Sequence, residues 1–275
     1  MQRTHIKPER LRGIITDYIH RWETKSWDAS DIPWSQIQME RLTDAHRSAV
    51  RFVTLIEDHI PWYLHALLAQ FPIDESVSPE QVMHNREAFR FFVRWAHEED
   101  RHAETFCRYQ LAAGIQSEEA LRAELTREAP KTWAFPQDLP VQIFTYTTIQ
   151  EKATQIYYAM LRRAVAEPVL KGILNQIQKD EAKHFALYAN ILQAYVEDLG
   201  QEAIPAIQEA LQAFKMPLAE QLENYWRWSL EISDTAGGYD HTVAFEDLVR
   251  VVNRAAGAPS WSQTMGEWVQ AVRAA

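Results

Sequence analysis

Apolar residues recur along most of the chain at spacings of three and four, which is the period of an amphipathic α-helix. The longest run begins at Ser78, an N-cap residue followed by Pro79, and continues without a breaker to Gly114, which corresponds to roughly 35 residues or ~52 Å of helix. Other long helices are predicted for 42–71, with a kink at Pro61, for 140–167 and for 168–200, and shorter ones for 9–23, 117–128, 202–214, 218–231, 241–256 and 260–273. The pattern predicts an all-α bundle that forms a single domain over 1–275, with its core at about 42–200 and further helices in 201–275.

Composition excludes several other classes of protein. The chain has 275 residues with only 8 glycines, too few for the tight turns of a β-sandwich, and its 47% hydrophobic content is enough for a sizeable core. The 28 basic and 38 acidic residues give a net charge of −10, which disfavours a nucleic-acid binder. No apolar run reaches the ~18–20 residues of a membrane span, and the N-terminus lacks the apolar core of a signal peptide. Because the one cysteine, Cys107, excludes an internal disulfide, we expect a protein of the reducing cytoplasm.

Acidic residues interrupt the apolar stripes of all four long helices. Glu57 has Val50, Val53, Ile60 and Leu64 as helical neighbours, so its carboxylate lies on the face that is expected to be buried. An isolated buried carboxylate costs several kcal/mol unless it is neutralised, paired or bound to a metal, so these side chains require a shared partner. On the other three helices the corresponding inward-facing residues are Glu99 and His102, Glu151, and Glu181 and His184.

Two of these helices carry a Glu-x-x-His pair and the other two a single Glu, which is the ligand set of carboxylate-bridged di-iron bundles. The i, i+3 spacing places a carboxylate and an imidazole one turn apart on the same face, so both reach one metal pair. A single Glu-x-x-His is common in acidic helices as a solvated charge beside a histidine, but two copies, 181 − 99 = 82 residues apart, favour a di-metal site. Oxygen and nitrogen donors suit iron or manganese. The neighbouring acids Glu98, Asp58, Glu104 and Glu167 lack this context, and we expect them to be solvated.

Three segments around these residues resemble the signatures of the soluble acyl-acyl-carrier-protein desaturases. They are WAHEEDRH at 95–102, YTTIQEKAT at 146–154 and DEAKH at 180–184, which are similar to that family's W-x-x-E-E-N-R-H, Y-T-S-F-Q-E-R-A-T and D-E-K-R-H. Weaker similarities at 57–61 and 25–28 extend the resemblance to roughly residues 20–200. The differences from the family's motifs, at Asp100, Lys152 and Ala182-Lys183, concern partner contacts and subunit packing more than the metals.

The resemblance implies a ferritin-like di-iron four-helix bundle elaborated with additional helices. Thr154 would face the oxygen-binding side of the cluster, where its hydroxyl relays a proton; the alternative for Thr154 is ordinary helix packing. Asp180 would accept the outer N–H of a ligand imidazole, that of His102, with Trp27 continuing this chain of contacts toward the surface. The two iron ions per chain would be held by Glu57, Glu99, His102, Glu151, Glu181 and His184, with Glu99 and Glu181 bridging.

By the same resemblance, the protein introduces a double bond into an acyl chain carried on acyl carrier protein, as part of fatty acid metabolism and lipid biosynthesis. Removing hydrogen from an unactivated methylene requires a stronger oxidant than any side chain, and two ferrous ions with O2 supply one. Two further electrons must come from a docked donor, which the family implies is a ferredoxin. We also expect a homodimer and an acyl channel lined by residues 65–70. Arg162, Arg163 and Lys171 are a candidate docking patch for the acidic carrier; the alternative is an ordinary solvated helix end.

Three alternatives use a similar scaffold. A di-iron hydroxylase or N-oxygenase would act on a carrier-bound polyketide or amino-acid unit, and product analysis separates it from a desaturase. The radical-generating subunit of ribonucleotide reductase places a tyrosine one turn after its first Glu-x-x-His, where this chain has Phe106. A ferritin-type iron-storage protein is usually much shorter, and nothing in 202–275 suggests a cage contact.

Overall fold

The computed structural model describes residues 4–22, 26–223, 225 and 242–256, and within these ranges it contains helices and no strand. The prediction of an all-α protein is confirmed. Four helices carry the predicted ligands: α2 (Asp44–Glu57), α4 (Pro79–Ala112), α6 (Pro140–Ala164) and α7 (Pro168–Leu199). The others are α1 (Pro8–Trp22), α3 (Ile60–Gln70), α5 (Glu118–Glu128), α8 (Ala203–Gln212) and α10 (Thr242–Ala256), with 3₁₀ turns η2 (Ala29–Asp31), η3 (Trp34–Gln36), η4 (Met39–Arg41) and η5 (Gly200–Glu202).

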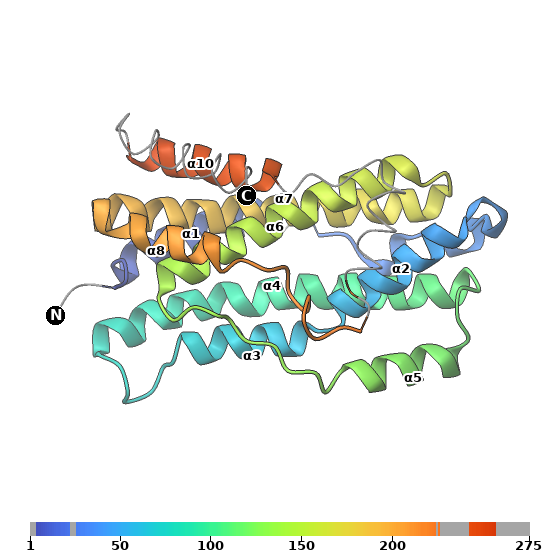
Figure 1. Cartoon of the computed structure of the whole chain (residues 1–275), viewed down its shortest axis with the longest axis horizontal. Helices are drawn as coiled ribbons and strands as arrows, with labels where there is room; N and C mark the ends of the chain where they lie inside the picture. Colours follow the sequence, from blue (N-terminus) through green and yellow to red (C-terminus); the bar gives the residue numbers. More distant parts are fainter. Residues whose placement is uncertain (1–3, 23–25, 224, 226–241, 257–275) are drawn as a thin grey trace.

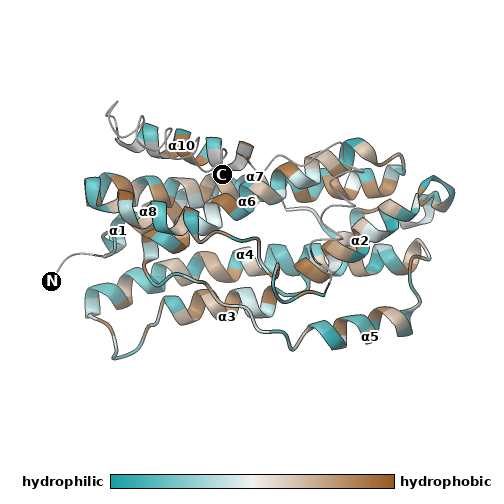
Figure 2. Ribbon diagram, in the orientation of Figure 1, coloured by the Kyte–Doolittle hydropathy of each residue, from teal (hydrophilic) through white to brown (hydrophobic). Residues whose placement is uncertain are grey.

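The central bundle is formed by α2, α4, α6 and α7, and the other helices lie around it (Figure 1). Helix α6 packs along α7, α2 packs against α4, and α1 contacts both α4 and α7. Helices α8 and α10 cover α6 and α7 from outside. Hydrophobic residues recur along these helices between hydrophilic ones (Figure 2), and their buried faces form one core. The result is the predicted four-helix bundle with additional helices.

Proline residues and capping side chains set the starts of the bundle helices. Helices α4, α6 and α7 each begin with a proline, whose missing N–H is not needed in the first turn. The Ser78 hydroxyl caps α4 by accepting from the backbone N–H of Gln81 at 3.2 Å, and Thr43 caps α2 in the same way through His46. These local signals fix where each helix enters the bundle, and therefore which residues reach its centre.

The predicted helix over 42–71 is in fact two helices. The sequence predicts a kink at Pro61, but α2 ends at Glu57 and α3 begins at Ile60, with Asp58 and His59 between them. Proline has no N–H to bond with the carbonyl four residues earlier, and its ring clashes with that carbonyl, which belongs to Glu57. The break therefore falls immediately after the first predicted ligand.

The segment after α8 differs more strongly from the prediction. Residues 217–223 form turns where the sequence predicts the start of a helix over 218–231. Leu218 has a φ of 62°, in the left-handed region that a right-handed helix does not include, and Pro217 before it lacks an N–H. Apart from Tyr225, the rest of that predicted helix lies outside the described residues, as does the one predicted for 260–273.

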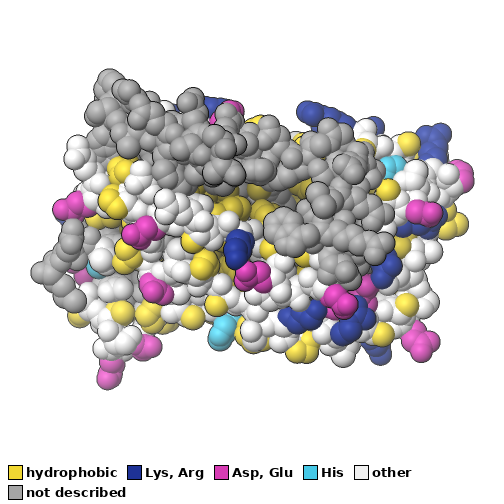
Figure 3. Space-filling model, in the orientation of Figure 1, with side chains coloured by type: hydrophobic (Ala, Val, Ile, Leu, Met, Phe, Trp, Pro, Cys, Tyr) yellow, Lys and Arg dark blue, Asp and Glu magenta, His cyan; other side chains and the backbone are white. Residues whose placement is uncertain are grey.

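The surface of the described part of the chain is mixed in character. On the face shown in Figure 3, acidic and basic side chains are interspersed, with hydrophobic side chains between them. None of the described helices is both long and apolar enough to cross a lipid bilayer.

Candidate metal centre

The six predicted ligand side chains come from four helices and lie in the middle of the bundle. Glu57 is the last residue of α2, and Glu151 lies halfway along α6. The two Glu-x-x-His pairs lie in the interior turns of α4 and α7. Every one of the six is at least nine-tenths buried, and the most exposed, Glu99, has 7% of its surface accessible. The acids that interrupt the apolar stripes therefore do face the core.

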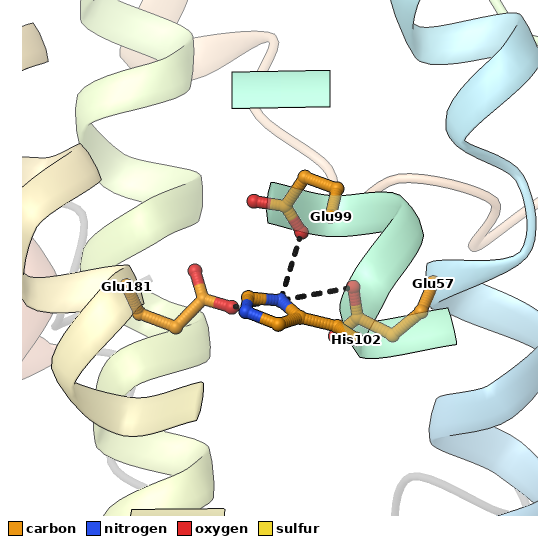
Figure 4. A group of neighbouring side chains, drawn as sticks. All are labelled: Glu57, Glu99, His102 and Glu181. Atoms are coloured by element: carbon orange, nitrogen blue, oxygen red, sulfur yellow. Dashed lines mark ion pairs between the residues drawn. The ribbon is translucent and has the colours of Figure 1, made fainter. Parts of the chain in front are cut away.

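These side chains form two overlapping groups of possible metal ligands. One group is Glu57, Glu99, His102 and Glu181 (Figure 4), and the other is Glu99, Glu151, Glu181 and His184. Within each group the ligand atoms lie within 4.8 Å of one another. Glu99 and Glu181 belong to both groups, so the arrangement provides two adjacent cation positions that share two carboxylates.

The individual oxygen atoms show how the two groups share these carboxylates. Glu99 directs Oε2 to within 3.3 Å of His102 Nδ1 and Oε1 to within 3.0 Å of His184 Nδ1. Glu181 directs Oε1 to His102 Nδ1 at 3.7 Å and Oε2 to His184 Nδ1 at 4.0 Å. Each carboxylate thus presents one oxygen to each position. Glu57 completes the first group, 3.9 Å from His102 Nδ1, and Glu151 completes the second, 3.4 Å from His184 Nδ1.

Several inward-facing atoms of the cluster have no hydrogen-bond partner among the described residues. They are Nδ1 of His102, Nδ1 of His184, Oε2 of Glu151 and Oε1 of Glu181. A buried polar atom that is left unpaired costs about 1–3 kcal/mol, and two of these atoms lie at each of the two positions, which indicates a missing partner at both. A pair of divalent cations fits this donor set, because carboxylate oxygens and imidazole nitrogens are ligands of iron and manganese.

Without cations, bound protons offset the negative charge of the buried carboxylates. Burial and the nearby Glu99 carboxylate raise the pKa of Glu57 to about 8. Burial alone would lower the pKa of His102, but Glu99 and Asp180 raise it to about 10. The pKa of Glu181 is raised well above its usual value by burial and by Glu99 and Glu151. Buried carboxylates that retain protons at neutral pH are groups whose protons a divalent cation displaces.

Asp180 binds the outer nitrogen of His102, as the sequence predicts. Its Oδ2 lies 3.2 Å from His102 Nε2 and accepts hydrogen bonds from Trp27 Nε1 at 2.6 Å and from Arg101 Nη2 at 3.0 Å. Lys183 pairs with the other oxygen. Although burial opposes the charge, His102 and Lys183 keep the pKa of Asp180 well below its usual range. The carboxylate is therefore ionised and fixes the orientation of the imidazole.

The expectation that Glu98 is solvated is wrong. His184 Nε2 lies 2.7 Å from Glu98 Oε2, so Glu98 supports His184 as Asp180 supports His102. Burial would raise the pKa of Glu98, but the hydrogen bond from His184 lowers it. The sequence does contain a signal: an acid directly precedes the Glu of each Glu-x-x-His pair, at 98–99 and at 180–181, and each preceding acid supports the histidine of the other helix.

The other three neighbouring acids are in different environments. Glu104 is exposed, as expected. Asp58 is half-buried, and burial raises its pKa. The expectation that Glu167 is solvated is also wrong, because it is fully buried. It caps α7 through the backbone N–H groups of Val169 and Leu170 and accepts the Tyr109 hydroxyl at 2.7 Å. It has a structural role at the junction between α6 and α7.

Two aromatic residues also bind predicted ligand carboxylates, and the sequence alone did not reveal them. The hydroxyl of Tyr158 donates a hydrogen bond to Glu57 Oε1, and Trp95 Nε1 donates to Glu151 Oε1 at 3.1 Å. Tyr158 lies two turns after Glu151 on α6, a spacing that places both on one face of the helix. Each link joins two different helices of the bundle.

Thr154 does not contact the cluster directly. Its hydroxyl donates to the Gln150 carbonyl of its own helix at 2.9 Å, a common arrangement for helical threonines. Its side chain also lines a cavity of about 90 Å³, together with Tyr158 and residues of α2. A role for Thr154 in the reaction stays a prediction.

Comparisons with known proteins identify the family of the chain and agree with its fold. The profile of the fatty acid desaturase family matches residues 2–255, so the chain belongs to that family. DesA1 of Mycobacterium tuberculosis, named as an acyl-carrier-protein desaturase, is 22% identical over 267 residues, covering 88% of this chain and 75% of the relative. A chloroplastic palmitoyl-carrier-protein 4-desaturase of the orchid Ophrys arachnitiformis subsp. archipelagi is 26% identical over 238 residues, covering 76% and 61%.

A solved structure shows the same fold. The crystal structure of DesA2 from Mycobacterium tuberculosis, also named as an acyl-carrier-protein desaturase, superposes with a TM-score of 0.64. The two chains are 19% identical, and the match covers 93% of this chain and 98% of DesA2. Family and relatives together confirm the resemblance to the acyl-carrier-protein desaturases.

Proposed function

We propose that this protein is a di-iron, O2-dependent desaturase that introduces a double bond into an acyl chain carried on acyl carrier protein. The main support is the pair of buried ligand groups that share Glu99 and Glu181, because two adjacent cations with shared carboxylates are the arrangement of the di-iron carboxylate bundles, and two ferrous ions with O2 can supply the oxidant. Membership of the fatty acid desaturase family supports the reaction, and the names of the relatives support a carrier-bound substrate.

The proposed roles of the residues follow from their positions. Glu57 and His102 would hold one ion, Glu151 and His184 the other, and Glu99 and Glu181 would bridge them. When bound, two ferrous ions together with O2 supply the oxidant: one O2, two added electrons and two protons convert two adjacent CH2 groups into CH=CH and release two waters. Asp180 and Glu98 hold the outer nitrogens of the two imidazoles, which fixes their tautomers and orientations.

The surrounding side chains keep the carboxylates in place and exclude water. The Tyr158 hydroxyl holds Glu57, and Trp95 holds Glu151. Phe106 is fully buried and packs on Tyr158, with ring centroids 6.0 Å apart. A dry, rigid environment of this kind protects a strong oxidant from side reactions.

The reaction also requires partners, which stay proposals. We propose that the substrate arrives on acyl carrier protein, that a ferredoxin-type protein donates the two electrons, and that the enzyme is a homodimer in the cytoplasm. Of the predicted basic docking patch, Arg163 and Lys171 are exposed, whereas Arg162 is half-buried and bonds to Asn175 at 3.0 Å. Two exposed cations on adjoining helices remain as the candidate docking contact for an acidic carrier.

The experiment that tests the function is a single turnover with analysis of the product. The protein is loaded anaerobically with ferrous iron, mixed with saturated acyl carrier proteins, and exposed to O2 and a reductant. Mass spectrometry then reads the acyl chain. A product lighter by two hydrogen atoms supports desaturation, and a product heavier by one oxygen atom would show an oxygenase instead. Loading with manganese in parallel tests the identity of the metal.

The assignment of the ligands has its own test. Glu151→Ala and His184→Ala each remove one ligand from the second group, so the iron content should fall from near two ions per chain while the helix content by circular dichroism stays nearly unchanged. Glu104→Ala is the matched control, because Glu104 is exposed on α4 and should leave the iron content unchanged. Full iron content in either ligand variant would contradict the assignment.

A further inference from the structure

The candidate metal centre includes a phenol that is hydrogen-bonded directly to one of the predicted ligands. The hydroxyl of Tyr158 donates to Oε1 of Glu57, whose other oxygen, Oε2, lies 3.9 Å from Nδ1 of His102 (Figure 4). One oxygen of Glu57 is therefore engaged by the phenol, while the other belongs to the first cation position. A single carboxylate group separates the phenol from that position.

Tyr158 lies in a dry, aromatic part of the core. Tyr158 and Glu57 are both buried, and the fully buried ring of Phe106 packs on the Tyr158 ring. The ring of Tyr157 meets that of Tyr158 edge-on, with centroids 5.6 Å apart. Because such surroundings exclude water and small solutes, they protect a reactive species formed on the Tyr158 ring from side reactions.

The hydrogen bond to a ligand distinguishes Tyr158 from the other buried tyrosines that interact electrostatically with the cluster. The hydroxyls of Tyr18, Tyr63 and Tyr188 are buried and have no hydrogen-bond partner among the described residues. A phenol that loses an electron becomes a strong acid, so it is oxidised readily only where a base within hydrogen-bond reach accepts its proton. Tyr158 has such a base in the carboxylate of Glu57.

Before any oxidation, the phenol keeps its proton. Burial and the negative charges of Glu57 and Glu181 raise the pKa of Tyr158 well above its usual value. Since a phenolate does not form in these surroundings, Tyr158 can lose an electron only together with its proton. The path of the proton is already in place, because the hydrogen bond leads from the phenol oxygen of Tyr158 to Oε1 of Glu57.

We propose that Tyr158 is a redox-active residue, which gives one electron to the iron pair after O2 has oxidised that pair and no acyl chain is present to react. In this step the O–H bond of Tyr158 breaks, the electron goes to the oxidised iron pair, the proton goes to Oε1 of Glu57, and a neutral phenoxyl radical remains. One electron from the donor of the proposed reaction, with return of the proton, restores the phenol.

This one-electron reaction is distinct from desaturation. It rests on the proposed function only for the iron pair and its oxidation by O2. Its benefit is protection, because an oxidant without a substrate otherwise attacks the side chains around it. Tyr158 takes up one oxidising equivalent reversibly and so preserves the ligands of the cluster.

Detection of the radical in the absence of substrate tests this role. The whole chain is loaded anaerobically with ferrous iron, mixed with O2 without any acyl substrate, and frozen at a series of times for electron paramagnetic resonance spectroscopy. We expect a tyrosyl radical, recognised because its spectrum narrows when the protein is produced with ring-deuterated tyrosine. The absence of a tyrosyl radical at every time would overturn the proposal.

One substitution and a matched control locate the radical. Y158F should abolish the signal, because phenylalanine keeps the ring and lacks the hydroxyl. Y109F is the control: Tyr109 is also buried and its hydroxyl also donates to a carboxylate, that of Glu167 at 2.7 Å, but at the junction between α6 and α7. Y109F should keep the signal. A tyrosyl radical that persists in Y158F would overturn the proposal.

A second measurement on the unaltered protein decides the matter if Y158F binds less iron. The proton that moves to Glu57 stays hydrogen-bonded to the phenoxyl oxygen of Tyr158. Electron–nuclear double resonance of protein prepared in H2O and in D2O should therefore show one exchangeable proton at that oxygen. A radical on Tyr18, Tyr63 or Tyr188 would lack it, because no described residue bonds to their hydroxyls. A radical without this proton would overturn the proposal.

The radical and the proposed function fail in different ways. A radical at Tyr158 together with no alkene in the turnover experiment would support this inference and refute the desaturase. An alkene together with no tyrosyl radical would support the desaturase and refute this inference.

Discussion

At the scale of single residues, each Glu-x-x-His helix supports the histidine of the other. Glu98 on α4 binds the outer nitrogen of His184 on α7, and Asp180 on α7 binds that of His102 on α4. The two supports are not held equally: Asp180 also accepts from Trp27, Arg101 and Lys183, whereas the hydrogen bond of Glu98 among the described residues is with His184. The outer nitrogen of His184 is therefore held by a carboxylate with fewer anchoring partners than the one that holds His102.

Glu98→Gln should weaken metal binding without removing a ligand. The amide keeps the size of the side chain but not its charge, so the imidazole of His184 becomes a poorer donor, and changes of this kind typically cost about 10–100-fold in metal affinity. Anaerobic titration of ferrous iron against a competing chelator measures the effect. Glu104→Gln, on the same helix and exposed, is the control. An affinity equal to that of the unaltered protein would show that Glu98 does not support the site.

The sequence predicted the convergence of the six side chains, and its resemblance to the family predicted Asp180 as the support of His102, but the other residues that hold the ligands were not predicted. Whether Glu99 or His184 faces the core depends only on the periodicity of its own helix, which is visible in the sequence. Whether Glu98 meets His184, or Tyr158 meets Glu57, depends on how two helices are rotated and shifted relative to each other. The relative rotation and shift of two helices are set by packing across the bundle, so they cannot be read from the apolar stripe of either helix alone.

At the scale of helices, the junctions position the ligands. The break after Glu57 lets α2 end at the cluster while α3 continues along α4. The junction between α6 and α7 depends on Glu167, which caps α7 and also accepts the Tyr109 hydroxyl and the backbone N–H of Gln38. The sequence showed Pro61 and Pro168 as breakers, but the left-handed turn at Leu218 has no glycine to signal it.

Glu167→Ala should destabilise the protein without removing a ligand. It leaves two backbone N–H groups of α7 without their cap and the buried Tyr109 hydroxyl without an acceptor, which together cost about 2–4 kcal/mol. Equilibrium unfolding in denaturant measures the loss. Glu118→Ala is the control, since Glu118 lies in the first turn of α5 with an exposed side chain. Equal stability of the two variants would contradict the role of Glu167 at the junction.

At the scale of the whole molecule, the cluster couples stability to pH. In the metal-free protein, the pKa of Glu57 is raised from 4.5 to about 8 and that of His102 from 6.5 to about 10. For both groups the folded state binds the proton more tightly than the unfolded chain, so the stabilising contribution is complete at low pH and is lost as the pH rises through the folded pKa. The pKa values of Glu99 and Asp180 are lowered, so their contribution to stability is instead lost as the pH falls, and only in acid.

The melting temperature of the metal-free protein should therefore fall as the pH rises from about 6 to about 9, because the buried carboxylates lose protons that nothing replaces. The iron-loaded protein, kept anaerobic, should not show this fall, since two divalent cations take the place of those protons and bind more tightly as proton competition decreases. Calorimetry of both forms across this range measures the difference between their melting temperatures, which should widen with pH. If the metal-free protein instead became more stable toward pH 9, the buried cluster would not be held together by protons, and the charge balance inferred for the cation pair would be wrong.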